Sequence, residues 1–140
     1  MDSGTFAWGI TASALVLFMT PGVAFFYGGL VKAKSVVSMM MMSFGAMALV
    51  GLLWILVGFN MSVAPDVWGW AGNPFTEAFA LNGVSSPDLV LAFFGSTFAI
   101  ITVALISGAI ADRAKFGSWM IFAGIWAIVV YFPVAAWVWV

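Results

Sequence analysis

The chain reads FAWGITASALVLFMTPGVAFFYGGL at residues 6–30, a run without a charged side chain. An α-helix rises about 1.5 Å per residue, so about 25 residues cross the roughly 30 Å hydrocarbon core of a bilayer with some tilt. The run is continuously apolar, whereas a membrane β-strand alternates apolar and polar residues. It therefore predicts a transmembrane helix.

Three further apolar runs follow, and we predict spans at about 6–30, 35–61, 89–111 and 117–140. Apolar residues make up 65% of the 140 residues and charged residues only 6%, against about 25% charged in an ordinary soluble domain. This composition cannot form a water-soluble surface. The predicted fold class is all-α: a polytopic transmembrane helix bundle with four spans, forming a single domain over residues 1–140.

The charged residues of the connections are distributed unevenly. All four basic residues lie between the first and second spans or between the third and fourth, at Lys32, Lys34, Arg113 and Lys115. Four of the five acidic residues lie instead in the amino-terminal segment and in the long second connection: Asp2, Asp66, Glu77 and Asp88. Basic loops stay on the cytoplasmic side of a membrane, so the amino terminus is expected outside.

Several function classes are excluded by what the sequence lacks. It contains no cysteine and no histidine, so disulfides, the usual zinc sites and histidine acid–base chemistry are not expected. Four basic residues do not make a nucleic-acid-binding surface. We expect no metal, no cofactor and no enzymatic activity, because no nucleophile, base or metal constellation is visible.

Two features of the spans could serve either packing or permeation. Pro21 removes one helix hydrogen bond and Gly22 follows it, which predicts a kink that either packs the bundle or shapes a path through it. Aromatic residues make up 17% of the chain and are numerous in the third and fourth spans. They favour core packing and an interfacial belt, or a site where a cation contacts aromatic faces.

Four blocks of the sequence resemble the Amt/Mep/Rh ammonium transporter family in order and spacing. MTPG at 19–22 is followed by FYGGL at 26–30 and KAK at 32–34; WILVGF stands at 54–59, FAIITVALISGAIADRAK at 98–115 and YFPVAAWVW at 131–139. Gly95 or Ser96 stands where the family usually has glutamine, and Ala136 where it has histidine. The resemblance extends from about residue 6 to residue 139.

The resemblance implies a larger architecture and two site residues. The family fold has eleven helices in two inverted five-helix repeats and assembles as a trimer with one pore per subunit. Phe98 matches a phenylalanine of the family's paired phenyl gate, and Trp139 matches a tryptophan of the outer cation–π site. Pro21 and Gly22 would then shape the pore or a kink.

The implied function is transport of ammonium or ammonia across the plasma membrane in a channel-like manner, with methylammonium as an alternative substrate. The cation would be recruited at an outer aromatic site and its nitrogen would pass through an apolar pore. We expect 140 residues to be a fragment of such a transporter. The alternative is a truncated, non-conducting paralogue with a structural or regulatory role in a membrane oligomer.

Overall fold

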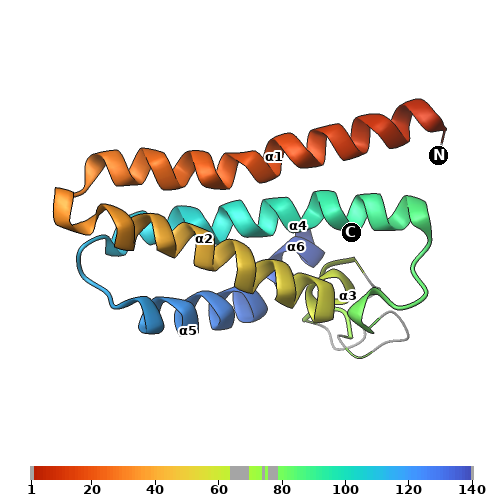
Figure 1. Ribbon diagram of the computed structural model, residues 1–140. Helices are drawn as coiled ribbons and strands as arrows, with labels where there is room; N and C mark the ends of the chain where they lie inside the picture. Colours follow the sequence, from red (N-terminus) through yellow and green to blue (C-terminus); the bar gives the residue numbers. More distant parts are fainter. Residues whose placement is uncertain (1, 64–69, 74, 76–78, 140) are drawn as a thin grey trace.

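The computed structural model describes residues 2–63, 70–73, 75 and 79–139. The regular structure in this part of the chain is helical (Figure 1). The α-helices are α1 (Ser3–Leu30), α2 (Val36–Leu53), α3 (Phe59–Val63), α4 (Ser86–Ile106), α5 (Phe116–Trp126) and α6 (Phe132–Trp139). Short 3₁₀ turns occur at Ala33–Ser35, Phe79–Leu81 and Ser107–Ile110. The predicted all-α class is confirmed.

Several of these elements join into longer helices. A π-helical turn, Trp54–Gly58, connects α2 to α3, and a second, Ala127–Tyr131, connects α5 to α6. Four resulting helices are long and apolar enough to cross a membrane: Ser3–Leu30, Ala33–Ser62, Ser86–Ile110 and Phe116–Val138. The third begins before the apolar run that starts at residue 89, because Pro87 fits the first turn of a helix without loss of a backbone hydrogen bond.

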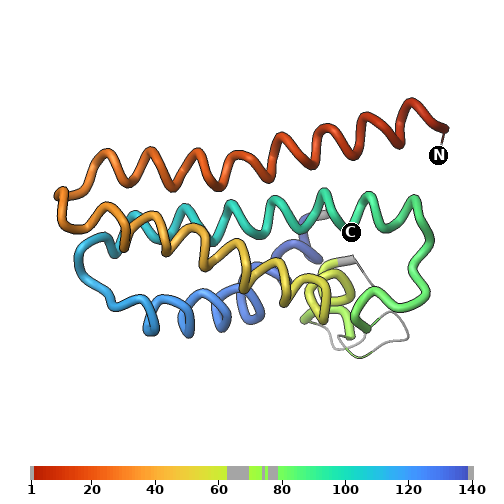
Figure 2. Tube along the Cα trace, in the orientation of Figure 1, coloured from red at the N-terminus to blue at the C-terminus, as the bar shows by residue number. Residues whose placement is uncertain are grey.

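The helices form a bundle around α2, which packs against α1, α4 and α5, while α1 also packs against α4 and α3 against α6. Figure 2 shows that the connection after α1 and the connection between α4 and α5 lie at the same end of the bundle. The amino terminus and the connection before α4 lie at the opposite end. All four basic residues are therefore at one end of the molecule.

The first helix, α1, is capped at its start and uninterrupted in its middle. The carboxylate of Asp2 accepts a hydrogen bond of 2.7 Å from the backbone N–H of Thr5, which satisfies one of the free donors of the first turn. Pro21 lies inside the helix, which continues to Leu30 (Figure 1). Gly22 is exposed, and a Cβ at this position would have no neighbour within 4 Å.

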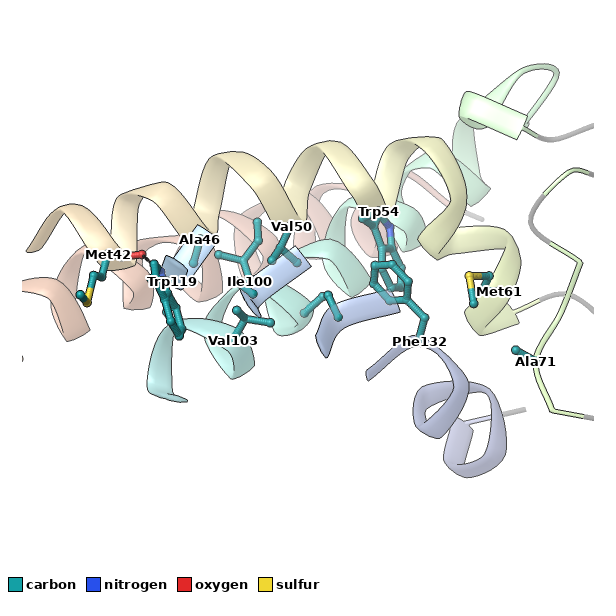
Figure 3. Packing of buried hydrophobic residues seen from close by; sticks show 14 of the residues in the cluster. Met42, Ala46, Val50, Trp54, Met61, Ala71, Ile100, Val103, Trp119 and Phe132 are labelled. Atoms are coloured by element: carbon teal, nitrogen blue, oxygen red, sulfur yellow. Dashed lines mark hydrogen bonds between the residues drawn. The ribbon is translucent and has the colours of Figure 1, made fainter. Parts of the chain in front are cut away.

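The hydrophobic core lies between α2, α4 and α5. Figure 3 shows Met42, Ala46 and Val50 of α2 in a row that faces Ile100 and Val103 of α4. The buried side chain of Trp119 completes this layer, and its Nε1–H donates a hydrogen bond of 2.9 Å to the carbonyl oxygen of Met42. This bond ties α5 to the middle of α2.

The first π-helical turn meets the start of α6 at the other end of the core. The ring of Phe132 lies so close to Gly58 that a Cβ there would come within 2.5 Å of Cζ. Phe132 also packs edge-on against Trp54, with ring centroids 5.7 Å apart and an angle of 69° between the planes (Figure 3). A glycine at position 58 is thus required for the close approach of the two long helices.

Much of the outer surface is apolar. Large hydrophobic side chains on α1 and α5 are exposed, among them Phe18 at 74% and Ile121 at 67%. Exposure of this extent is typical of helices that face lipid or other apolar helices, rather than water.

Candidate functional site

A cavity of about 630 Å³ opens beside α4, near the end of the bundle that carries the amino terminus. Its lining comes from α4, from the π-helical turn after α2 and from α3: Trp54, Phe59, Asp88, Leu91, Phe94, Gly95 and Phe98. Its volume falls within the roughly 300–1,000 Å³ range of small-molecule sites, and its walls are mainly aromatic.

One face of α4 supplies most of the cavity wall. The lining residues of this helix recur three or four positions apart, which places them on successive turns of the same face. Asp88 lies in the first turn and is exposed, whereas Phe98 is half-buried, about 15 Å further along the axis at about 1.5 Å per residue. A carboxylate therefore stands at one end of an apolar strip and an aromatic ring at the other.

The aromatic end of the strip is a pair of phenylalanines one helical turn apart. The rings of Phe94 and Phe98 pack edge to face, with centroids 4.8 Å apart and an angle of 77° between their planes. This geometry aligns the positive edge of one ring with the negative face of the other. The negative face of an aromatic ring attracts cations, an attraction that reaches about 2 kcal/mol when water is excluded.

The opposite wall of the cavity is the indole ring of Trp54. A Cβ at Gly95 would lie 2.7 Å from Cζ2 of this ring, so only glycine admits the indole against α4. Trp54 is almost fully buried, and its Nε1–H has no hydrogen-bond partner among the described residues. The shape of the cavity wall thus depends on the large indole ring of Trp54 and on the lack of a Cβ at Gly95, which faces it.

Asp88 is the charged residue of the lining. Its Oδ2 accepts a hydrogen bond of 2.7 Å from the hydroxyl of Ser85, which holds the carboxylate near the start of α4. An exposed carboxylate at the entrance of an apolar cavity raises the local concentration of cations. The described residues contain no group of three or more His, Cys, Asp or Glu side chains that could hold a metal ion.

Only some of the predicted site residues line the cavity. Phe98 lines the cavity, while Pro21 and Gly22 lie on α1 and do not. The side chain of Trp139 falls outside the described part of the chain, so its position relative to Phe98 stays a prediction.

Sequence reasoning assigned no individual role to five lining residues: Trp54, Phe59, Asp88, Leu91 and Phe94. Phe94 could have been found from the sequence, because it lies four residues before Phe98 and so on the same face of a helix. Asp88 lay in the connection before the third predicted span. Trp54 faces α4 only because of the helix packing, which spacing along α2 does not reveal.

Four apolar helices long enough to span a bilayer, two of which line an aromatic cavity of the size of small-molecule sites, define a helical membrane protein. A family model described as the Ammonium Transporter Family matches residues 7–140. The chain belongs to this family.

Similar proteins agree with this assignment. The chain is 48% identical over 160 residues to an ammonium transporter of Mycobacterium tuberculosis, an alignment that covers 98% of this chain and 33% of the relative. It is 48% identical over 146 residues to an ammonium transporter of Aquifex aeolicus, covering 99% of this chain and 34% of that one.

Among solved structures, Mep2 of Candida albicans superposes with a TM-score of 0.87 at 31% sequence identity, over 99% of this chain and 32% of that one. The chain spans about a third of the length of the curated relatives it matches.

Proposed function

We propose that these residues form part of a path by which ammonium or ammonia crosses the cell membrane. The observation that carries the proposal is the cavity in which the carboxylate of Asp88 and the paired rings of Phe94 and Phe98 lie on one face of α4. The cavity suits a small cation that is first attracted by a carboxylate and then loses part of its water shell against aromatic rings. Family membership supports the same substrate class.

The steps follow from the order of the groups. Asp88 attracts the cation from water by a long-range electrostatic effect, which raises the rate of capture. The cation then exchanges part of its water shell for aromatic faces, each contributing up to about 2 kcal/mol. Dewetting an ion costs much more than one such contact returns, so several faces are needed. Phe98 and Trp139 are proposed as two of them, Phe98 within the gate and Trp139 at the outer recruitment site. The nitrogen passes on through an apolar pore, without a covalent bond to the protein.

The proposed setting is the plasma membrane, with the amino terminus outside and a homotrimer as the working assembly. The distribution of charge supports the orientation, because the end of the bundle with the basic connections is the one expected in the cytoplasm. Asp88 and the cavity beside it would then face the exterior, where ammonium is captured.

A second candidate is a membrane protein that does not conduct by itself and acts within an oligomer. The observation that favours it is the wall of the cavity, which comes from α4 and the segment from Trp54 to Phe59. A pore between inverted repeats needs walls from both repeats. We therefore expect the 140-residue chain to insert into membranes without selective ammonium flux.

The test compares two proteins in proteoliposomes. One is the 140-residue chain, and the other is a chimera in which these residues replace the matching segment of the Mycobacterium tuberculosis relative. Ammonium-dependent current and internal pH are recorded. The proposal expects saturable ammonium flux from the chimera that falls on Phe98→Ala. A chimera that folds as a transporter but carries no flux would contradict it.

The 140-residue chain decides between the two candidates. Saturable flux from this chain alone, lost on Trp139→Ala, would exclude the non-conducting reading. Flux in the chimera with none in the 140-residue chain is the result that we expect.

A further inference from the structure

A second cavity lies at the end of the bundle opposite the aromatic one. Its volume is about 300 Å³, near the lower limit for small-ligand sites. Its lining comes from the segment that begins α2 and from the connection between α4 and α5: Lys32, Lys34, Ser35, Ser38, Met39, Met42, Asp112 and Ala114. The proposed permeation path does not use any of these residues.

The charges around this cavity do not cancel. Two ammonium groups, from Lys32 and Lys34, and one carboxylate, from Asp112, line it, so the lining carries a net charge of about +1 when each group has its ordinary charge. Within the described residues neither lysine forms an ion pair. The site therefore matches a ligand with a single negative charge.

Two hydroxyl groups add neutral hydrogen-bond donors. Inside the spans, the hydroxyls of Thr97, Thr102 and Ser107 bond back to carbonyl oxygens three or four residues earlier. Ser35 and Ser38 make no such bond in the part of the chain that the structure describes. Their hydroxyls remain available to a ligand in the cavity, beside the ammonium groups.

The floor of the cavity is apolar and rigid. Met39 and Met42 are each only 2% exposed, and Met42 belongs to the layer that Trp119 ties to α5. A ligand that combines a charged group with a short apolar stem would place the stem on this floor. Since the cavity lies where the helices end, it sits at the depth of lipid headgroups when the bundle spans a bilayer.

From these groups we infer that the cavity binds a phosphate-bearing group with a hydrogen-bond donor beside the phosphate. The ammonium groups of Lys32 and Lys34 and the hydroxyls of Ser35 and Ser38 bind the phosphate oxygens. The carboxylate of Asp112 accepts the neighbouring donor. Such a group occurs as a lipid headgroup, of which phosphatidylglycerol is an example, or as free phosphate in its dihydrogen form, which also carries a single negative charge.

Asp112 supplies the hydrogen-bond acceptor of the site. It has a φ of 63°, a left-handed conformation that asparagine also adopts readily. Asp112→Asn therefore removes the charge without straining the backbone. Phosphatidylcholine carries a quaternary ammonium without an N–H, so it offers Asp112 no hydrogen bond. The site should prefer phosphatidylglycerol to phosphatidylcholine.

The experiment measures dissociation constants of the 140-residue chain in uncharged detergent micelles by calorimetric titration. The probes are short-chain phosphatidylglycerol, short-chain phosphatidylcholine and inorganic phosphate. The test variant is Lys32→Gln with Lys34→Gln. The control is Lys115→Gln, because Lys115 is an exposed lysine at the same end of the bundle that does not line the cavity.

The Lys115→Gln control distinguishes binding at the cavity from general electrostatic attraction to the basic surface. Every lysine near the membrane contributes similarly to that general attraction. We expect the double variant to weaken phosphatidylglycerol binding by about tenfold or more and Lys115→Gln by less than about twofold. If inorganic phosphate binds with the same dependence on the two lysines, free phosphate is the ligand source. Equal effects of Lys115→Gln and the double variant, or no binding of phosphatidylglycerol or of inorganic phosphate, would overturn the inference.

Two further variants keep the test valid if the double variant does not fold. Ser38→Ala should weaken binding severalfold while the helical circular dichroism spectrum stays the same. Asp112→Asn should strengthen the binding of both phosphatidylglycerol and inorganic phosphate, because it removes a negative charge from the lining while the asparagine Oδ1 still accepts a hydrogen bond. Unchanged binding of both anions in the Asp112→Asn protein would show that this carboxylate does not face the ligand and would contradict the proposed ligand class.

Discussion

The indole ring of Trp54 occupies the space that a side chain at position 95 would need, since a Cβ there would lie 2.7 Å from Cζ2. The contact joins the π-helical turn after α2 to the middle of α4 and forms one wall of the aromatic cavity. Cavity shape and helix packing therefore depend on the same pair of residues.

Gly95→Ala should destabilise the protein, because the added methyl group overlaps a buried ring that has little room to move. We expect the free energy of unfolding to fall by about 1–3 kcal/mol, the usual cost of overpacking. The measurement is thermal or denaturant unfolding in micelles, followed by circular dichroism. Gly22→Ala is the control: its methyl group meets no neighbour within 4 Å, and it should leave stability unchanged or raise it by up to about 1 kcal/mol.

Phe98→Ala should reduce ammonium flux through the chimera by about tenfold or more, because it removes an aromatic face of the cavity. Phe18→Ala is the matched control, since Phe18 is 74% exposed on α1 and lies away from the cavity. Equal losses in both variants would point to impaired insertion rather than to a gate. Folding of each variant is checked by gel filtration before the flux assay.

Asp88→Asn should lower the initial rate of ammonium uptake at low ionic strength by severalfold. The reason is the loss of a carboxylate that attracts cations at the entrance of the cavity. The difference should shrink as salt is raised, because the Debye length falls to about 8 Å at 0.15 M. Uptake that responds to Asp88→Asn equally at all salt concentrations would argue against electrostatic capture.

Trp119→Phe should destabilise the core by about 1–3 kcal/mol, the cost of removing a partner from a buried polar group. The Nε1–H of Trp119 donates across the bundle to the carbonyl oxygen of Met42, and the smaller ring also leaves a void. Trp8→Phe is the control, because Trp8 is 69% exposed. Comparable unfolding of the two variants in micelles would show that the hydrogen bond contributes little.

The first turn of α1 should loosen in acid. Hydrogen bonds from Thr5, led by that of its backbone N–H, hold the pKa of Asp2 below its usual 3.8. Because the pKa of Asp2 is lower in the folded state, the cap stabilises the helix fully at pH values above the usual pKa. This stabilisation is lost as the pH falls through the lowered pKa. NMR shifts of the Thr5 amide should follow this titration, and Asp2→Asn should abolish it.

Much of the architecture follows from the sequence because lipid permits few solutions. A charge-free run such as residues 6–30 must satisfy its backbone hydrogen bonds internally, so its helical state could be predicted from composition alone. The distribution of Lys32, Lys34, Arg113 and Lys115 likewise indicated which connections share an end of the bundle.

The cavity was harder to predict, because its walls come from contacts between distant segments. Phe98 could be identified through the family resemblance, but nothing along the chain shows that Trp54 lies over Gly95. Asp88 was assigned to the connection before the span predicted at 89–111. It lies instead within the first turn of α4, on the same face as Phe98.

The two π-helical turns have a consequence for how insertions and deletions act on this chain. In each turn a backbone N–H bonds to the carbonyl five residues earlier, from Phe59 to Trp54 and from Phe132 to Ala127. Each turn thus holds one residue more than an α-helix would, and this residue rotates everything after it by about 100° relative to an unbroken α-helix. Deleting one residue in the turn Trp54–Gly58 would keep α3 helical but aim Phe59 away from the cavity. A one-residue change in length would therefore act on this membrane helix as a rotation, and it would change which side chains face the cavity.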